Sequence, residues 1–419
     1  MWLGGPNCVA RRTELCGTTQ FGPPCHTIRS SGGSEYGSWP TCPPPLVALN
    51  LLQRFISNRK QKVRVGSKIS SNTADISIGV LQGSIFGVVL FLVHINDLGF
   101  CLEVLFSVIF ADDITSLSSD SDFNNLVLKV NSELRKLSTW YRANKLAVHP
   151  KKSEFMIFRP NNLPIQTNFS ILFDNNDFGE NDPQKMYNIK QITNYTEKNF
   201  IKVLGIRIDE KLTLDKPVNH ICAKISSVIY NLNRVKNVLD TKYLRMIYFA
   251  HIHSHLNYCS LIFTLIPNKL TKRISKLQKK AVRAVCKKGY RDHTSPLFLA
   301  MKILPFRDLI YFNILNLMKE FKNKMLPQTF ISTWLLNSEL GNVYNSRNAS
   351  DFNITRLRYQ YLKDHPFFFF PKAWNDLTFS LKYAIRKNKF SMNLKSFLLY
   401  KLEEGYSDNC SCQLCFINI

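Results

Sequence analysis

Two adjacent aspartates, Asp112 and Asp113, lie between two apolar segments, EVLFSVIF at 103–110 and ITSLSS at 114–119. Two carboxylates side by side repel each other and lose solvation energy on burial, so a positive partner is expected beside them. The flanking segments have the composition of strands, which predicts a hairpin with the aspartates at its tip. Paired carboxylates there would supply the hard oxygen ligands that Mg²⁺ prefers; a plain Asp-rich β-turn is the alternative.

The segments around this pair predict a mixed architecture. GVLQGSIFG at 79–87 supplies glycines that let backbone come close to a phosphate or base pair, and Ser84 can cap a helix over 85–98. A long amphipathic helix is expected over 122–146, followed by strands at 153–158 and 200–209. Strand, helix and strand in this order favour an α+β fold, an antiparallel sheet with helices on one face, and the chain beyond about residue 216 reads as helical.

The charge of the chain is strongly positive, with 55 Lys and Arg against 30 Asp and Glu, a net charge of +25. Such a chain usually meets a polyanion, most often nucleic acid; a solvated basic surface is the alternative. The basic residues concentrate in 268–291, where they fall on one arc of a helix and apolar residues fall on another. The residues predicted to contact a nucleic-acid backbone are Lys272, Arg273, Lys276, Lys279, Lys280 and Arg283.

The remaining features carry weaker signals. Residues 1–45 are rich in Cys, Gly and Pro and are predicted to be a disordered leader. The aromatic run 367–370 could stack on bases, but a buried packing role is favoured. The eleven cysteines are scattered, which predicts reduced thiols in an intracellular protein of the nucleus or cytoplasm, and the role of Cys410, Cys412 and Cys415 stays open. The sequence contains no apolar run of about 20 residues, so no membrane span is predicted. The sequence does not indicate an oligomeric state.

Five short segments in order resemble the reverse transcriptase domain of non-LTR retrotransposons of the jockey-like kind, over roughly residues 46–405. They are GVLQGS at 79–84, INDL at 95–98, FADD at 110–113, the segment 144–152 and the LG pair at 204–205. The resemblance implies a polymerase palm over 46–215, a thumb-like basic region over 216–290 and a helical C-terminal region over 291–419. It implies RNA-directed DNA polymerase activity by two-metal nucleotidyl transfer, with an RNA template, a DNA primer and deoxynucleoside triphosphates as partners.

The same resemblance implies roles for single residues. Asp112 and Asp113 would bind Mg²⁺ or Mn²⁺. Gln82, Gly83 and Lys152 would lie near the nucleotide and template, and Leu204 and Gly205 near the primer end.

The sequence also departs from the family. The family's palm needs a third carboxylate on an earlier strand, yet the first aspartate of this chain is Asp75, and the leader stands where that strand and the fingers would be. Leu81 and Val88 also stand where proline is usual. We therefore expect an N-terminally truncated domain that lacks a central palm strand and has little or no polymerase activity alone. The alternative is a non-catalytic nucleic-acid-binding remnant of a decayed mobile element.

Overall fold

The computed structural model divides into two compact units, Met1–Leu212 (unit 1) and Thr213–Ile419 (unit 2), and each is described by itself. Unit 1 mixes a sheet with helices and unit 2 is helical, so the general α+β class is confirmed. The described residues are 7–16, 46–62, 64–69, 72–76, 79–81, 83–149, 152–159, 168–174, 186–330, 333–340, 351–354, 360–382 and 387–404.

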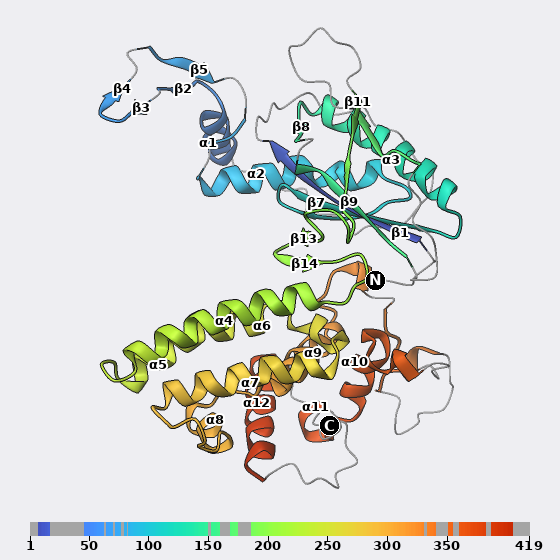
Figure 1. Ribbon diagram of the computed structural model, residues 1–419. Helices are drawn as coiled ribbons and strands as arrows, with labels where there is room; N and C mark the ends of the chain where they lie inside the picture. The colour runs from blue at the N-terminus through green and yellow to red at the C-terminus, as the bar shows by residue number, and fades with distance from the viewer. Residues whose placement is uncertain are drawn as a thin grey trace. The chain divides into compact units, whose positions relative to one another are not determined.

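Unit 1 is built on one six-stranded sheet with the order β12-β9-β1-β7-β6, and β8 pairs with the end of β1 (Figure 1). Strand β1 is antiparallel to β7, β8 and β9, and β6 is antiparallel to β7, whereas β12 and β9 are parallel. The strands are β1 (Asn7–Cys16), β6 (Phe106–Phe110), β7 (Asp113–Asp120), β8 (Ala147–Val148), β9 (Glu154–Phe158) and β12 (Lys190–Gln191).

The central strand corrects the prediction of a disordered leader. Asn7–Cys16 pairs with β7 on one side, from Asn7 opposite Asp120 to Glu14 opposite Asp113, and with β9 on the other. The expected gap in the sheet is therefore filled, because the facing edges of β7 and β9 offer unpaired backbone groups that an extended segment can satisfy. The rest of the predicted leader, residues 1–6 and 17–45, lies outside the described residues.

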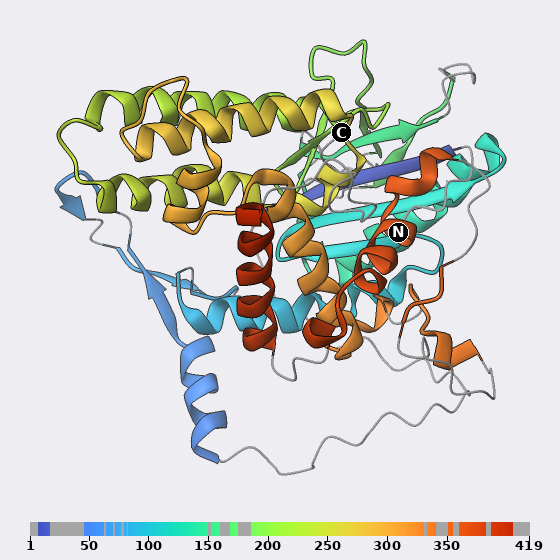
Figure 2. The ribbon, with the colours of Figure 1, turned by 90° about the horizontal axis from the view of Figure 1, so that it is seen from below.

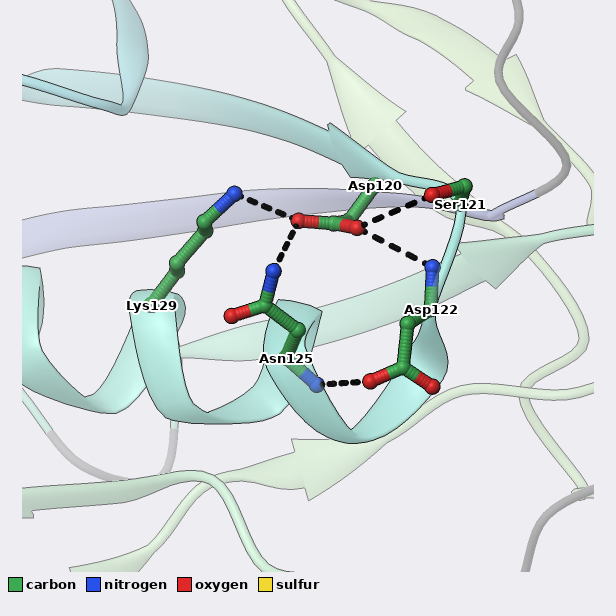
Figure 3. A network of polar contacts seen from close by, with 5 residues as sticks. All are labelled: Asp120, Ser121, Asp122, Asn125 and Lys129. Atoms are coloured by element: carbon green, nitrogen blue, oxygen red, sulfur yellow. Dashed lines mark hydrogen bonds and ion pairs between the residues drawn. The ribbon is translucent and has the colours of Figure 1, made fainter.

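Helix α3 (Phe123–Ala143) covers the sheet with the apolar face that the sequence predicted. Its inward residues Leu126, Val130, Leu134, Leu137 and Tyr141 are all buried. A polar network fixes its start against the end of β7 (Figure 3). The Asp120 carboxylate accepts hydrogen bonds from Lys129 Nζ at 2.5 Å and from Asn125 Nδ2 at 2.8 Å, while Asp122 caps the helix through the Asn125 amide. Lys129 and the Asp122 amide hold the pKa of Asp120 below its usual value.

The rest of unit 1 consists of two helices and short hairpins. Helix α1 (Leu46–Ile56) precedes two two-stranded pairs, β2 with β5 and β3 with β4. Helix α2 (Ile85–Ile95) begins at the predicted Ser84 cap and passes into the 3₁₀ helix η1 (Asn96–Cys101). The remaining strands are β2 (Arg59–Gln61), β3 (Arg64–Val65), β4 (Lys68–Ile69), β5 (Ala74–Ile76), β10 (Leu172–Asp174), β11 (Met186–Asn188), β13 (Ile201–Val203) and β14 (Ile206–Ile208).

Gly87 lets the first turn of α2 close tightly on the segment before it. A Cβ added there would lie 2.7 Å from the Leu81 carbonyl oxygen and 2.8 Å from Ser84 Oγ, the atom that caps the helix. We expect Gly87→Ala to destabilise unit 1 by about 1–3 kcal/mol, because backbone must shift to admit the methyl group. Urea unfolding followed by circular dichroism measures this. Gly99→Ala, whose Cβ would meet nothing within 4 Å, should be neutral; equal effects would contradict the steric argument.

Unit 2 is a helical body around one apolar core that runs from Leu214 to Leu398, across the boundary predicted at residue 290 (Figures 1 and 2). Helices α4 and α7 lie side by side, and α9 packs against α7, α10 and α12. No helix of the described residues combines the length and apolarity needed to cross a membrane. The segments are α4 (Asp215–Val235), α5 (Thr241–Tyr248), the π-helical η3 (Phe249–His253), α6 (Ser254–Asn257), η4 (Ser260–Leu265), α7 (Asn268–Val285), α8 (Ser295–Met301), α9 (Phe306–Lys322), η5 (Gln328–Phe330), η6 (Asn337–Leu340), η7 (Gln360–Asp364), α10 (Pro366–Asn375), α11 (Phe379–Lys382) and α12 (Lys387–Glu404).

Candidate functional site

The aspartate pair lies at the tip of a tight hairpin, as predicted. Strands β6 and β7 pair from Phe106 opposite Leu117 to Phe110 opposite Asp113, which leaves Ala111 and Asp112 as a two-residue turn. Such turns need a positive φ at their first residue, and Ala111 has φ 51°. A non-glycine residue in this region carries local strain, which is common where a turn must present functional side chains.

The hairpin places its two carboxylates differently. Asp112 is exposed at the turn, whereas Asp113 is half-buried and lines an apolar cleft of about 160 Å³. The other wall of the cleft comes from Val203 and Leu204, so the structure brings Asp113 and the predicted primer-side residue Leu204 together. The cleft is small, and apart from Asp113 its lining is almost entirely apolar.

The segment 200–209 forms a hairpin, not the single strand predicted from its apolar run. Strands β13 and β14 pair antiparallel, and Leu204 and Gly205 form the two-residue turn between them with φ of 43° and 89°. Two positive φ values are what a type I′ turn requires, and Gly205 adopts its value without steric cost. The residues on either side of the LG pair do form strands, but the LG pair itself is a turn between them.

A third acidic residue lies on the strand that pairs with β7, opposite Asp113. Glu14 is the only acidic residue of β1, and its Cα partner across the ladder is Asp113. In the sequence alone Glu14 has no strand-like context, because β1 pairs with strands about 100 and about 150 residues further along the chain and nothing in ARRTELC indicates those contacts. Among residues with described side chains, no three His, Cys, Asp or Glu form a group that could hold a metal ion.

The predicted nucleotide-side residues are less well gathered. Gly83 has φ 87° and precedes the Ser84 cap, so its glycine is required by backbone conformation. Lys152 is exposed, and its backbone amide donates a hydrogen bond to the His149 carbonyl at 3.1 Å. Neither residue lines the cleft beside Asp113. Gln82 lies outside the described residues.

Glu133 on α3 holds the segment that leads into β6. Its carboxylate is buried, accepts hydrogen bonds from the Glu103 amide at 2.8 Å and the Val104 amide at 3.2 Å, and pairs with Lys136 Nζ at 2.9 Å. Burial alone would raise the pKa of Glu133, but these hydrogen bonds outweigh burial and hold the pKa below its usual value. The hairpin that carries the aspartates is thus anchored at its start by one buried side chain.

The basic arc predicted on 268–291 forms one wall of a groove in unit 2. The groove, of about 550 Å³, lies between α4 and α7 and has small residues of α4, Ala223 and Ser226, on its other wall. The predicted apolar arc of α7 is buried, including Ile274, Ala281 and Val285, which confirms the amphipathic assignment. The cations that line the groove are Arg273, Lys276, Lys279, Lys280 and Arg283.

Two of these cations are already oriented by neighbours. Arg273 Nη1 donates to Asn219 Oδ1 at 2.5 Å, and Arg283 Nε donates to the Asp292 carbonyl at 2.8 Å. Cys222 also lines the groove, and burial raises the pKa of its thiol despite the nearby Arg273. No acidic residue lines the groove, so its field favours an anion. Lys272, the sixth predicted contact, is exposed on α7 outside this groove.

Comparison of the sequence with protein-family models and with curated proteins finds no match.

Proposed function

We propose that unit 1 is a polymerase palm and that the chain is a fragment of an RNA-directed DNA polymerase (reverse transcriptase) domain of a retrotransposon. The observation that carries the proposal is the β6–β7 hairpin, which presents Asp112 and Asp113 at a tight turn beside a central strand and beside Leu204. An Asp-rich turn with no functional role would have no reason to combine a strained Ala111 with a second hairpin against it.

The donor set suits a hard divalent cation. Asp112 and Asp113 would hold Mg²⁺ or Mn²⁺ through carboxylate oxygens, and Glu14, whose backbone pairs with Asp113, would be the third carboxylate of the set. Metal bound there supplies activation of a primer hydroxyl and charge neutralisation of the leaving pyrophosphate. The protein's own part is to fix the carboxylates on rigid strands and to offer the apolar face of Leu204 and Val203 toward the primer end.

Activity is expected to be weak. A glutamate in place of the usual aspartate extends the third carboxylate by one methylene, and nucleotidyl transfer depends on position to fractions of an ångström. The proposal is tested by primer extension on an RNA template with deoxynucleoside triphosphates and Mg²⁺ or Mn²⁺, with and without a chelator. DNA synthesis that persists in the presence of the chelator would count against the proposal. So would a complete lack of synthesis together with a lack of Mn²⁺ binding.

Glu14 gives a sharper prediction. We expect Glu14→Asp to raise metal-dependent extension several-fold, because the shorter side chain restores the usual reach, and Glu14→Gln to lower it and to weaken Mn²⁺ binding. Steady-state extension and Mn²⁺ titration measure the two effects. Glu197→Gln, a substitution at a glutamate in the segment between β12 and β13, is the matched control and should change neither. Identical behaviour of Glu14→Asp and Glu14→Gln would remove Glu14 from the site.

A second candidate function is nucleic-acid binding without synthesis. The groove between α4 and α7 favours it, because five cations and no acid line one cleft. Binding that is strongly salt-dependent, with no metal-dependent extension under any condition, would select this function over the first.

A further inference from the structure

Three clefts of unit 2 are linked by shared cationic side chains. The groove between α4 and α7 shares Lys276 and Lys279 with a second cleft, of about 420 Å³, between α7 and the segment around α8 and α9. That second cleft shares Arg307 with a third, of about 370 Å³, between α9 and α10. The three clefts are therefore neighbours in unit 2, with these cationic side chains between them.

One of the linking cations, Arg307, has an unused hydrogen-bond donor among the described residues. Arg307 is half-buried, and its Nη1 is buried without a hydrogen bond. Its Nη2 makes only a long contact of 3.4 Å to Asn268 Oδ1. Burial lowers the pKa of Arg307. A desolvated guanidinium with unused donors is costly unless an anion supplies acceptors.

The third cleft has the most aromatic lining of the three. Its wall contains buried Phe263, Tyr311 and Phe369, and the half-buried Phe368 lies at its rim with Lys372 Nζ 5.7 Å from the ring centroid. The predicted aromatic run lies on helix α10, where Phe369 and Phe370 are buried, as favoured from sequence, while Phe368 is half-buried; Phe368 and Phe369 both line the cleft. Arg307, Lys363 and Lys372 stand there against one carboxylate, Asp364.

This combination selects a ligand with two parts. An inorganic anion would need the cations but not the aromatic wall, and an apolar molecule would need the wall but not an unpaired guanidinium. A nucleotide unit has both a ring that stacks on an aromatic face and a phosphate for the cations. The first cleft is lined by five cations and one aromatic residue, Tyr290, and the second by four cations together with Phe298, Phe306 and the carboxylate of Asp308. Their excess of cations suits a sugar-phosphate backbone.

We propose that the three clefts form one track for a single strand of nucleic acid, with the phosphates along Arg273, Lys276, Lys279 and Arg307 and one unpaired nucleotide in the aromatic cleft. The track rests on the nucleic-acid-binding part of the proposed function but not on catalysis. A duplex cannot supply the unpaired nucleotide, since its bases are stacked and paired.

The test measures binding of the full chain by fluorescence anisotropy to two labelled probes, a 12-nucleotide single-stranded RNA and a blunt 12-base-pair duplex. A single nucleotide, AMP, is added as an unlabelled competitor. Phe368→Leu should weaken binding of the single strand about 5- to 100-fold and leave duplex binding unchanged, because it removes one stacking face. Phe368→Tyr, which keeps the ring, should bind like the parent. Lys276→Gln with Lys279→Gln should reduce the salt slope for the single strand by about 1.4.

The matched control is Lys324→Gln with Lys389→Gln, two exposed lysines that line none of the three clefts, and it should leave the slope unchanged. Phe368→Leu that melts like the parent yet binds the single strand normally would overturn the track. Equal loss of duplex and single-strand binding would overturn the choice of a single strand. AMP binding as tight as that of the oligonucleotide would make the aromatic cleft a free-nucleotide site and also overturn the track. Asp113→Asn should bind all probes normally, so a failure of catalysis is distinguishable from a failure of the track.

Discussion

Asp113→Asn is expected to lower metal-dependent primer extension at least about 100-fold, and to weaken Mn²⁺ binding in parallel. Asp113 is the half-buried member of the pair, it starts β7, and its backbone is paired with both Phe110 and Glu14. The amide keeps the shape and the hairpin but removes the charge that a divalent cation requires, and losing even a group that only supports a metal ligand costs about 10- to 100-fold. Extension rates at saturating primer-template measure the first effect and Mn²⁺ titration the second.

The matched control is Asp75→Asn. Asp75 is exposed on β5 and pairs with Lys60 at 3.8 Å on the surface, so the same chemical change there should alter neither readout. If extension by the parent chain is below detection, the Mn²⁺ titration alone decides. Unchanged Mn²⁺ affinity in both Asp112→Asn and Asp113→Asn would show that the hairpin tip is an ordinary acidic turn.

Local elements were predictable because their signals are local. The apolar spacing of Leu126, Val130 and Leu134 indicated α3, Ser84 indicated the start of α2, and the segments around Asp112 indicated the hairpin. Each depends on neighbours within one or two turns of chain, so periodicity and capping suffice. The same holds for α7, whose cationic residues and apolar residues each recur at helical spacing and so lie on separate faces.

The misassigned elements depend on distant partners. β1 is a strand because β7 and β9 flank it, and these strands follow it by about 100 and about 150 residues. No pattern in 7–16 carries that information, so both the strand and the position of Glu14 beside Asp113 were missed. The LG pair at 204–205 is a turn because the chain folds back on itself there, whereas its apolar neighbours alone favour one continuous strand. Arg307 was not predicted as a binding residue, because the burial of its Nη1 without a hydrogen bond depends on the packing around it, which the sequence does not show.

The candidate site is therefore partly predictable. The hairpin position of Asp112 and Asp113 follows from residue type and the flanking strands, and Leu204 lines the same cleft as Asp113. The structure does not gather Lys152 or Gly83 around the same cleft. Long-range gathering of side chains depends on how the sheet edges and hairpins pack, and the energy of that packing is spread over the whole core.

Glu133→Ala is expected to destabilise unit 1 by about 3 kcal/mol. The change leaves the Glu103 and Val104 amides without their acceptor at the start of β6, and it removes the buried partner of Lys136. Because the pKa of Glu133 is lowered in the folded chain, its contribution is fully present above the unfolded pKa of about 4.3 and is lost as pH falls through the folded pKa. Urea unfolding at pH 7 and at acid pH, followed by circular dichroism, measures both effects.

The control for this prediction is Glu103→Ala, which removes the exposed carboxylate that pairs with the same Lys136 at 2.9 Å. A surface ion pair contributes about 0–1 kcal/mol, so this variant should unfold almost like the parent. Glu133→Gln should fall between the two, since the amide oxygen still accepts one backbone hydrogen bond but carries no charge. Its deficit relative to the parent should shrink as pH falls from the unfolded pKa through the lowered folded pKa of Glu133, below which the parent's side chain is protonated too. A deficit that stays constant with pH would mean that Glu133 acts by shape and packing, and that the anchor of the aspartate hairpin is not electrostatic.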